Sequence, residues 1–289
     1  MIRRLCIVGV GLIGGSLARA LRGAGGVEEI VGCSRDPAHL QRAVDLGVID
    51  RFDTNMARAV DGADMVVLCV PMGAMTAVFR AIASHLAADA VVTDAGSSKR
   101  SVIESAREAF GELPDFLVPG HPIAGTENSG VEASFATLYR GRKVILTPTS
   151  VSREDAADKV RRMWELTGAE VLDMEPEHHD EVLAATSHLP HLLAYNLVDV
   201  LGNMEERREM FRYAAGGFRD FTRIASSDPV MWHDICLANR DAVLEALDAF
   251  TDALCQMRAA VANGDGERLK SRFVRAKALR DEYVVKEPS

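Results

Sequence analysis

Histidine and arginine are the side chains of this sequence best suited to chemistry on a small anionic molecule. His121 stands in the stretch GHPIAGTENSG, residues 120–130, directly after an apolar run and among small and polar residues. A neutral imidazole accepts a proton near physiological pH, so His121 can act as a general base. The alternative is a loop histidine that bonds only to backbone. Ser97 and Lys99, in VTDAGSSK, could orient the substrate hydroxyl from which His121 takes this proton. Alternatively, they could simply cap a helix and lie at the surface.

Two arginines in the later half could bind a carboxylate. Arg219 and Arg223 are four residues apart in GGFRDFTRIASSDP and share one face if that segment is helical. Guanidinium groups bind carboxylates through two parallel hydrogen bonds. The alternative is a surface ion pair with Asp220 or Asp228.

The motif TSHLPH, residues 186–191, brings further histidines. His188 and His191 are three residues apart, and Pro190 between them should distort the helical turn. A zinc site that also uses His178 and His179 is disfavoured, because no HExxH motif or cysteine partner is present. A histidine that contacts substrate is the better interpretation.

A glycine-rich loop near the start predicts a dinucleotide site. GVGLIGGS follows the apolar run 5–8 and precedes the helical pattern LARALR. Gly9, Gly11 and Gly14 have the GxGxxG spacing, in which they allow a tight turn, close approach of backbone N–H groups to a pyrophosphate, and close helix packing. Leu12 and Ile13 complete the predicted cofactor loop. The alternative is a glycine-rich turn in another α/β fold.

The residues that follow the second, third and fourth predicted strands bear on which cofactor is bound and where it lies. In CSRD, Ser34 and Arg35 stand where an NAD-specific site often has aspartate, and they suit a 2′-phosphate, while Asp36 could still reach a ribose. NADP is plausible and NAD is not excluded. The loops after the third and fourth strands should face the nicotinamide and contribute Val70, Pro71 and Ser97.

These residues must be positioned by two halves with different periodicity. Short β-branched runs alternate with helical patterns up to EVLDM, residues 170–174, which is typical of a parallel sheet wrapped by helices. After Pro176 nearly everything is predicted helix. We expect a Rossmann-type dinucleotide-binding domain over residues 1–173 and an all-α substrate and dimerisation domain over residues 174–289.

A long helix within the second half should carry an apolar seam. Six apolar residues recur there at spacings of four and three, namely Val243, Leu247, Phe250, Leu254, Met257 and Val261. The seam packs either inside the chain or between subunits, and we favour a homodimer.

The composition limits the classes of partner that we expect this protein to bind. A formal charge of −9 gives no reason to expect nucleic acid or an anionic membrane surface, and no apolar run is long enough to span a bilayer. The five cysteines are scattered and mostly in apolar segments, which predicts reduced core residues in a cytoplasmic protein.

Taken together, these motifs resemble the prephenate dehydrogenase family, including its arogenate and cyclohexadienyl variants. The resemblance covers roughly residues 1–280 and runs through GVGLIGGS, DAGSSK, GHPIAGTENSG, YRGRKVILTPT, SHLPH and GGFRDFTRIASSDPVMW. It implies oxidation of prephenate to 4-hydroxyphenylpyruvate, or of arogenate to tyrosine, with NAD or NADP, in tyrosine biosynthesis.

The resemblance also implies roles for individual residues. His121 matches the catalytic histidine and Ser97 the serine that holds the hydroxyl and the nicotinamide. Arg223 matches the arginine that binds the ring carboxylate of a dicarboxylate substrate. Other polar positions match pocket residues, namely His191, Thr126, Glu127, Asp220 and Arg219, the last replacing a frequent lysine. A different NAD(P)-dependent hydroxyacid dehydrogenase and a non-catalytic nucleotide sensor are the other hypotheses.

Overall fold

The structure is a computed structural model that describes residues 1–205 and 207–284. The chain divides into two compact units, residues 1–240 and residues 241–289. The first unit contains all the strands and the helices up to α11, and the second contains most of α12 and all of α13.

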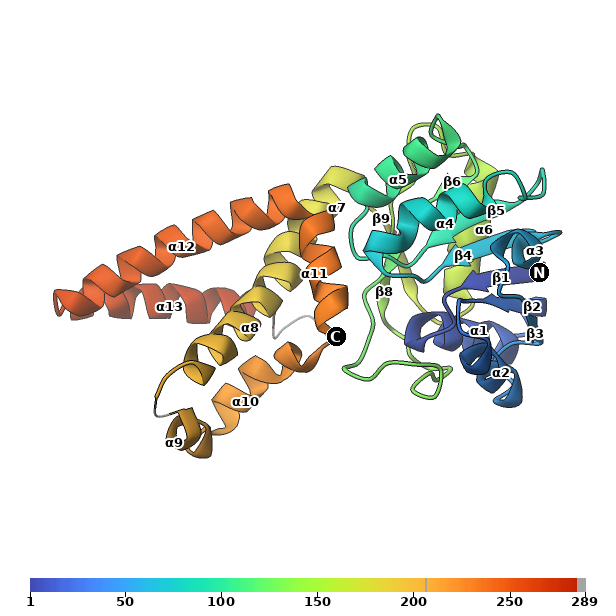
Figure 1. Cartoon of the computed structure of the whole chain (residues 1–289). Coiled ribbons are helices and arrows are strands. Elements are labelled where there is room, and N and C mark those ends of the chain that lie inside the picture. The colour runs from blue at the N-terminus through green and yellow to red at the C-terminus, as the bar shows by residue number, and fades with distance from the viewer. Residues whose placement is uncertain (206, 285–289) are drawn as a thin grey trace. The chain divides into compact units, whose positions relative to one another are not determined.

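A six-stranded parallel sheet forms the centre of the first unit (Figure 1). Its strand order is β3-β2-β1-β4-β5-β6, so the order reverses between β1 and β4. Ligands of such sheets bind outside the carboxyl ends of the strands at this reversal. The strands are β1 Ile2–Val8, β2 Val27–Cys33, β3 Arg51–Phe52, β4 Met65–Leu68, β5 Val91–Asp94 and β6 Leu117–Val118. The short β3 was not among the predicted strands.

Helices cover both faces of this sheet. Alternate residues of β1 enter different cores: Leu5 and Ile7 belong to one, Cys6 and Val8 to the other. The first core is closed by α1 Leu12–Gly23, α2 Pro37–Asp45 and α6 Glu154–Glu165. The second is closed by α3 Met56–Val60, α4 Met75–Ile82, α5 Arg100–Phe110 and α11 Pro229–Ala238. Because the apolar strands are buried on both sides, they read as continuous hydrophobic runs.

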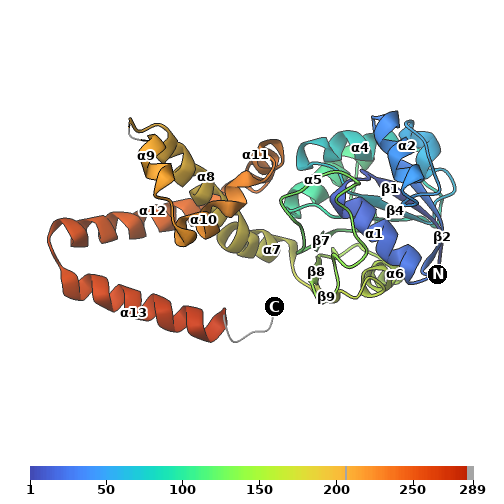
Figure 2. The ribbon, with the colours of Figure 1, turned by 90° about the horizontal axis from the view of Figure 1, so that it is seen from below.

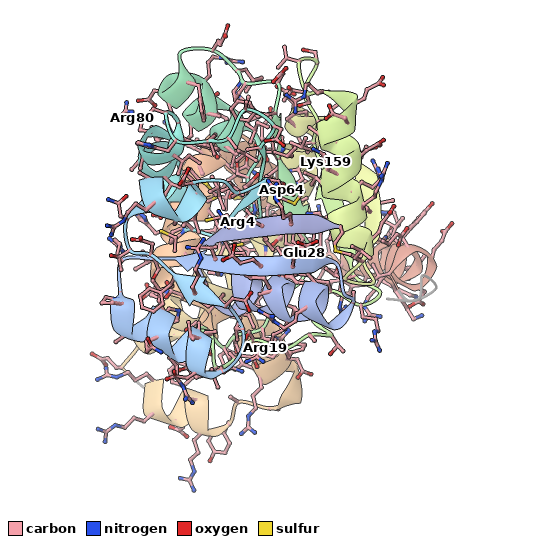
Figure 3. The ribbon with its side chains drawn as sticks, turned by 90° about the vertical axis from the view of Figure 1, so that its right-hand side faces the viewer. Arg4, Arg19, Glu28, Asp64, Arg80 and Lys159 are labelled. Carbon is pink, nitrogen blue, oxygen red and sulfur yellow. The ribbon has the colours of Figure 1, made fainter. Side chains whose placement is uncertain are left out.

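The edge at which the strands begin is held by charged groups. The Asp64 carboxylate accepts hydrogen bonds from the backbone N–H groups of Arg3 and Arg4, at 3.1 and 2.7 Å. The Arg4 side chain pairs with Glu29 on β2. Figure 3 shows Arg4, Glu28 and Asp64 on this side of the unit.

A second sheet of three strands corrects the expectation of one parallel sheet. It contains β7 Gly120–Pro122, β8 Lys143–Leu146 and β9 Glu170–Asp173, and β7 pairs with β8 antiparallel. The predicted strand 116–120 is therefore split at Pro119, whose carbonyl accepts a hydrogen bond from Thr147 N–H at 2.9 Å. In Figure 2 this sheet lies beside α6. The register places His121 inside a strand, opposite Ile145, rather than in a loop.

From Pro176 onward the described residues form helices without strands, as the sequence predicts. In the first unit these are α7 Pro176–Leu183, α8 Leu189–Gly202, α9 Arg207–Arg212 and α10 Gly216–Thr222, followed by a 3-10 turn Arg223–Ser226 and α11. Between α7 and α8, residues Ala184–His188 form a π-helical turn. The distortion expected at Pro190 therefore lies in the turn before it.

The second unit is a hairpin of α12 Arg240–Ala262 and α13 Gly266–Tyr283. Asp265 caps α13 by accepting a hydrogen bond from Arg268 N–H. Several residues of the predicted seam are exposed, namely Phe250, Leu254 and Val261. Cys255 is also exposed, and this corrects the expectation of a core residue, whereas Cys6 and Cys33 are buried. Within residues 1–205 and 207–284, no helix is long and apolar enough to cross a membrane.

Candidate active site

The glycine-rich loop connects β1 to α1 at the point where the strand order reverses. Gly9 has φ 96°, a conformation that L side chains rarely adopt, and an added Cβ would lie 2.2 Å from the carbonyl oxygen of Cys69. A Cβ on Gly14 would lie 2.3 Å from the carbonyl oxygen of Gly9. A Cβ on Gly11 would meet nothing within 4 Å. The loop is thus tightly packed on its inner side and open at Gly11.

The first turn of α1 has no side-chain cap. Gly11 is its N-cap residue, and no side chain accepts a hydrogen bond from the N–H groups that follow. Leu12 is buried, whereas Ile13 is partly exposed. Free N–H groups at a helix N-terminus bind phosphate groups. The chain therefore fits the pyrophosphate of a dinucleotide at this place.

The end of β2 presents the residues predicted to select between cofactors. Arg35 is exposed and Ser34 is partly exposed. Asp36 is committed to capping α2, because its carboxylate accepts hydrogen bonds from Ala38 and His39 N–H at 2.9 and 3.3 Å. One carboxylate oxygen of Asp36 is thus engaged in capping α2.

The loops after β4 and β5 border the same edge of the sheet. Val70 is partly exposed and Pro71 is exposed, directly after β4. Ser97 is partly exposed in the loop after β5 and has no hydrogen bond to another residue of the described ranges. Its hydroxyl is available to a ligand.

His121 lies on β7 and contacts a second histidine. Its Nδ1 is 2.9 Å from Nε2 of His179, which comes from α7. The two rings meet edge to face, with centroids 5.1 Å apart. His179 is fully buried, whereas His121 is partly buried. One ring nitrogen of His121 is therefore engaged, and Nε2 has no hydrogen bond to any residue the structure describes.

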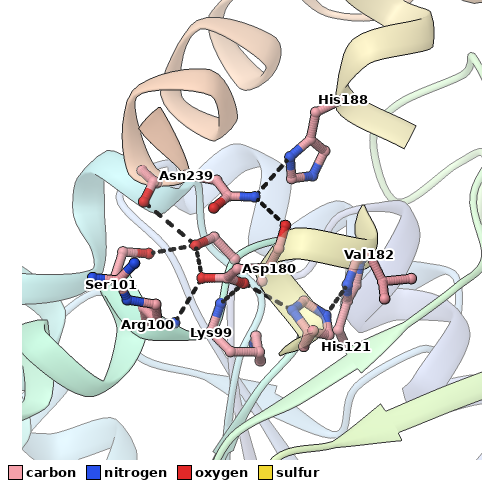
Figure 4. Close-up of polar contacts among 12 residues, drawn as sticks. Lys99, Arg100, Ser101, His121, Asp180, Val182, His188 and Asn239 are labelled. Carbon is pink, nitrogen blue, oxygen red and sulfur yellow. Dashed lines mark hydrogen bonds and ion pairs between the residues drawn. The ribbon is translucent and has the colours of Figure 1, made fainter. Parts of the chain in front are cut away.

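Asp180 connects this histidine pair to the start of α5 (Figure 4). Its buried carboxylate contacts Nδ1 of His179 at 2.8 Å. It also accepts hydrogen bonds from the N–H groups of Lys99 and Arg100, at 2.8 and 3.0 Å, and from the hydroxyl of Ser98 at 3.0 Å. The carboxylate satisfies the N–H groups that begin α5 and locks α7 against that helix.

Lys99 is a buried structural cation, which corrects the expectation of a surface group. Its side chain is 0% exposed, and its Nζ contacts the Asp94 carboxylate at 2.5 Å and the Gly120 carbonyl oxygen at 2.6 Å. Asp94 in turn accepts a hydrogen bond from Gly120 N–H at 3.1 Å. This clamp ties the end of β5 to the residue before His121, so the Lys99 ammonium group is engaged within the protein.

Burial keeps the histidines of this region neutral. It lowers the pKa of His121 well below the usual 6.5, and the neighbouring His179 and Lys99 lower it further. Burial likewise lowers the pKa of His179, although its hydrogen bond to Asp180 opposes this. Burial raises the pKa of the Asp180 carboxyl, but the hydrogen bonds from His179, Lys99 and Arg100 outweigh it and lower the pKa. The result is a neutral His121 joined through the ring of His179 to an ionised Asp180.

The π-helical turn and α8 bring two further histidines to the region. His191 donates from Nδ1 to the Ser187 carbonyl at 2.8 Å and stacks on Trp232, with ring centroids 3.5 Å apart. His188 is buried, and its Nδ1 contacts the Asn239 amide nitrogen at 3.2 Å. Burial lowers the pKa of His188 to about 4. No group of three or more potential metal ligands occurs within residues 1–205 and 207–284.

Arg223 reaches the loop that follows His121. Its Nη1 lies 3.7 Å from Oε2 of Glu127, and both side chains are at least half exposed. The suggested ion pair of Arg223 with Asp220 or Asp228 is therefore wrong: Asp228 instead caps α11. Burial lowers the pKa of His191, and the positive charge of Arg223 lowers it further.

The remaining predicted pocket residues make few contacts with the rest of the candidate site. Thr126 is exposed, and its hydroxyl accepts a hydrogen bond from Asn128 N–H at 3.2 Å. Arg219 and Asp220 are exposed on α10. Neither forms an ion pair with another described residue, so the structure does not join them to His121.

Sequence reasoning missed the buried polar groups behind His121. Asp94, Lys99, Asp180 and Asn239 were given no part in this network, and His179 was considered only as a metal ligand. The surrounding sequence PEHHDEVL is mostly polar, so it gave no signal that His179 and Asp180 are buried.

The fold and the glycine-rich loop are those of a nicotinamide-dinucleotide-dependent oxidoreductase. Two family models match: "Prephenate dehydrogenase, nucleotide-binding domain" over residues 17–173 and "Prephenate dehydrogenase, dimerization domain" over residues 175–275. The chain therefore belongs to the prephenate dehydrogenase family.

Individual relatives agree with this membership. Cyclohexadienyl dehydrogenase of Zymomonas mobilis is 40% identical over 281 residues, which cover 96% of this chain and 95% of that protein. The crystal structure of prephenate dehydrogenase from Aquifex aeolicus with hydroxyphenyl propionate and NAD+ is 40% identical, with a TM-score of 0.90 and 98% of each chain covered. Synechocystis arogenate dehydrogenase is 27% identical, with a TM-score of 0.81 and 97% of this chain and 100% of that chain covered.

Proposed function

We propose that this protein catalyses the oxidative decarboxylation of prephenate, arogenate or both, with hydride transfer to NAD+ or NADP+, in tyrosine biosynthesis. The observation that carries the proposal is a neutral, partly buried His121 at the carboxyl edge of a dinucleotide-binding sheet, in a chain of this family. Both substrates carry a ring hydroxyl and a ring carboxylate, which need a base and a cation respectively.

The first chemical task falls to His121. Its Nε2 accepts the proton of the ring hydroxyl as the hydrogen on the same carbon leaves as hydride. Ser97, whose hydroxyl has no partner within the described residues, is proposed to hold that ring oxygen. The pKa of His121 lies well below 6.5, so the imidazole is deprotonated and ready at neutral pH.

Loss of the ring carboxylate completes the reaction. Oxidation makes a cross-conjugated ketone. The bond to the carboxylate then breaks and carbon dioxide leaves. The electron pair of that bond makes the ring aromatic, and the ring oxygen takes up a proton to give the phenol. Aromatisation supplies the driving force, so the protein needs mainly to position the groups. Arg223 is proposed to bind the carboxylate, and Glu127, at 3.7 Å, would be displaced or shared when the substrate binds. His191, Thr126, Asp220 and Arg219 are proposed to line the rest of the pocket.

The cofactor is proposed to bind across the glycine-rich loop. The uncapped first turn of α1 and the open space at Gly11 suit its pyrophosphate. Bound there, NAD+ or NADP+ supplies the hydride acceptor. The proposed contacts are Gly9, Gly11, Leu12, Ile13, Gly14, Ser34, Arg35, Val70, Pro71 and Ser97. Arg35 is exposed, which favours a 2′-phosphate without requiring one.

The helical region is proposed to form a homodimer and to complete the substrate site, with the division between domains at 173/174. The exposed apolar residues Phe250, Leu254 and Val261 support an intersubunit seam, as does the dimerization domain of the family over residues 175–275. A cytoplasmic location and the lack of nucleic-acid or membrane partners stay predictions from the sequence.

The test is a steady-state assay of prephenate and arogenate, each with NAD+ and NADP+, read by the absorbance of reduced nicotinamide. We expect turnover in at least one combination. A panel of simple 2- and 3-hydroxy acids serves as the control, because the alternative hypothesis is another hydroxyacid dehydrogenase on this scaffold. Turnover of those acids alone would favour the alternative, and cofactor binding without any turnover would indicate a nucleotide sensor.

A further inference from the structure

Two buried residues of α7 stand directly behind His121. His179 is 0% and Asp180 1% exposed, and both come from the segment that joins the strands to the helical region. Their contacts form one line: His121 Nδ1 to His179 Nε2 at 2.9 Å, then His179 Nδ1 to the Asp180 carboxylate at 2.8 Å. No water separates the three groups at these distances.

The position of each proton along this line can be assigned by starting at the Asp180 carboxylate and moving toward His121. Asp180 already accepts hydrogen bonds from Lys99 N–H, Arg100 N–H and the Ser98 hydroxyl, which an ionised carboxylate does best. It can therefore only accept from His179, so Nδ1 of His179 carries its proton. In a neutral ring the other nitrogen, Nε2, is then a hydrogen-bond acceptor. Nδ1 of His121 must donate to it, and Nε2 of His121 is left with a free lone pair.

We propose that His179 and Asp180 are positioning residues that hold His121 in the tautomer whose Nε2 is unprotonated and faces the substrate. This inference rests on the proposed function, because it assigns the atom of His121 that takes the proton. The reverse arrangement places a ring nitrogen lone pair of His179 against a buried carboxylate, and such an unpaired contact is costly.

The surroundings hold this line in place. The Asp180 carboxylate is fixed at the N-terminus of α5, an eleven-residue helix whose N–H groups favour a negative charge. The Asn239 side chain donates to the Asp180 backbone carbonyl at 2.7 Å, and the Lys99 clamp fixes Gly120, the neighbour of His121. Both ends of the line are thus anchored on rigid elements. Ser-His-Asp enzymes use a buried carboxylate in the same way to fix a histidine tautomer.

The first experiment reads the tautomer directly and without turnover. The wild-type protein is labelled with 15N-histidine and its ring nitrogens are observed by NMR, in the absence of substrate and cofactor. His121→Asn identifies the signals of His121. We expect a protonated Nδ1 and an unprotonated Nε2 for His121 near neutral pH. A protonated Nε2 would overturn the inference.

The second experiment compares two replacements of the same buried residue. In His179→Gln the amide oxygen can stand in for Nε2 and accept from His121, whereas His179→Leu removes the acceptor. We expect His179→Gln to keep kcat within about 10-fold of wild type and His179→Leu to lose about 100-fold, with KM little changed in both. Asp180→Asn, which can donate to His179 and reverse the line, should also lose about 100-fold or more. Equal kcat for Gln and Leu, or losses confined to KM, would contradict a positioning role.

The outcomes separate this inference from the proposed function. If the expected tautomer is found but neither prephenate nor arogenate is oxidised, the proposed function fails and the inferred tautomer stands. If the substrates are oxidised while Nε2 of His121 carries the proton, the inference fails and the function stands.

Discussion

His121 is the residue on which the proposed chemistry depends. Its imidazole is partly buried, neutral and bonded through Nδ1 to His179, so Nε2 is the atom free to accept a proton. His121→Asn should lower kcat by about 100-fold or more with little change in KM, because a general base is lost while the binding groups stay. Steady-state kinetics measure this, with His85→Asn, an exposed histidine, as the control.

Arg223 is proposed to act on binding more than on turnover. Arg223→Ala should raise KM by about 10- to 100-fold, the range of one charge-assisted hydrogen-bonded pair. Its present partner Glu127 is half exposed, so the folded protein should lose little stability. The matched control is Arg212→Ala, an exposed arginine on α9. If kcat fell and KM did not change, Arg223 would have a different role.

At the scale of elements, two glycines of the loop between β1 and α1 should have different roles: Gly14 in stability and Gly11 in cofactor binding. Gly14→Ala would place a Cβ 2.3 Å from the Gly9 carbonyl oxygen, so it should destabilise the protein by about 2 kcal/mol or more. Gly11→Ala meets nothing within 4 Å and should cost about 1 kcal/mol or less, but its methyl group enters the space proposed for the pyrophosphate. Urea unfolding and the KM for cofactor measure the two effects. Equal effects of both variants on stability would contradict this division.

The sequence was a good guide to elements whose pattern is local. The strand-loop-helix of GVGLIGGS and the alternation of apolar runs predict the parallel sheet, because each follows from residues close together in the chain. The second sheet was missed because the antiparallel pairing of His121 with Ile145 depends on residues 24 apart. Periodicity does not encode such a contact.

The candidate site, like the fold, was predicted only in part. Motifs indicated His121, His191 and Arg223, but not the groups behind them. Asp180 lies 81 residues from Lys99, and Lys99 looked like an ordinary surface lysine until the fold buried it against Asp94. Buried polar networks form between distant segments, so the spacing of residue types does not reveal them.

At the scale of the whole molecule, buried histidines make stability depend on pH. Burial lowers the pKa of His121, His179, His188 and His191 in the folded state, so the unfolded chain binds more protons as the pH falls below about 6.5. For His188, whose folded pKa is about 4, this removes about 2 kcal/mol between pH 7 and pH 5. Urea unfolding at both pH values should show lower stability at pH 5, and an equal or higher value would contradict the assignment.

The proposed homodimer gives a second prediction at this scale. Leu254→Asp places a charge in the exposed apolar seam of α12 and should shift the protein toward monomer. Sedimentation velocity measures the change. Ala259→Asp, also exposed on α12 but outside the seam, is the matched control and should stay dimeric. A wild-type monomer, or equal behaviour of the two variants, would refute the seam as the interface.

The proposed reaction couples oxidation of the hydroxyl-bearing ring carbon, with His121 as the base, to loss of the ring carboxylate. The most direct measurement counts reduced nicotinamide and carbon dioxide released from prephenate, or from arogenate if that is the substrate used, by wild type and by His121→Asn. We predict equal amounts of the two products from wild type and a parallel loss of both, by about 100-fold or more in rate, in the variant. Cofactor reduction without carbon dioxide, or full turnover without the imidazole, would contradict it.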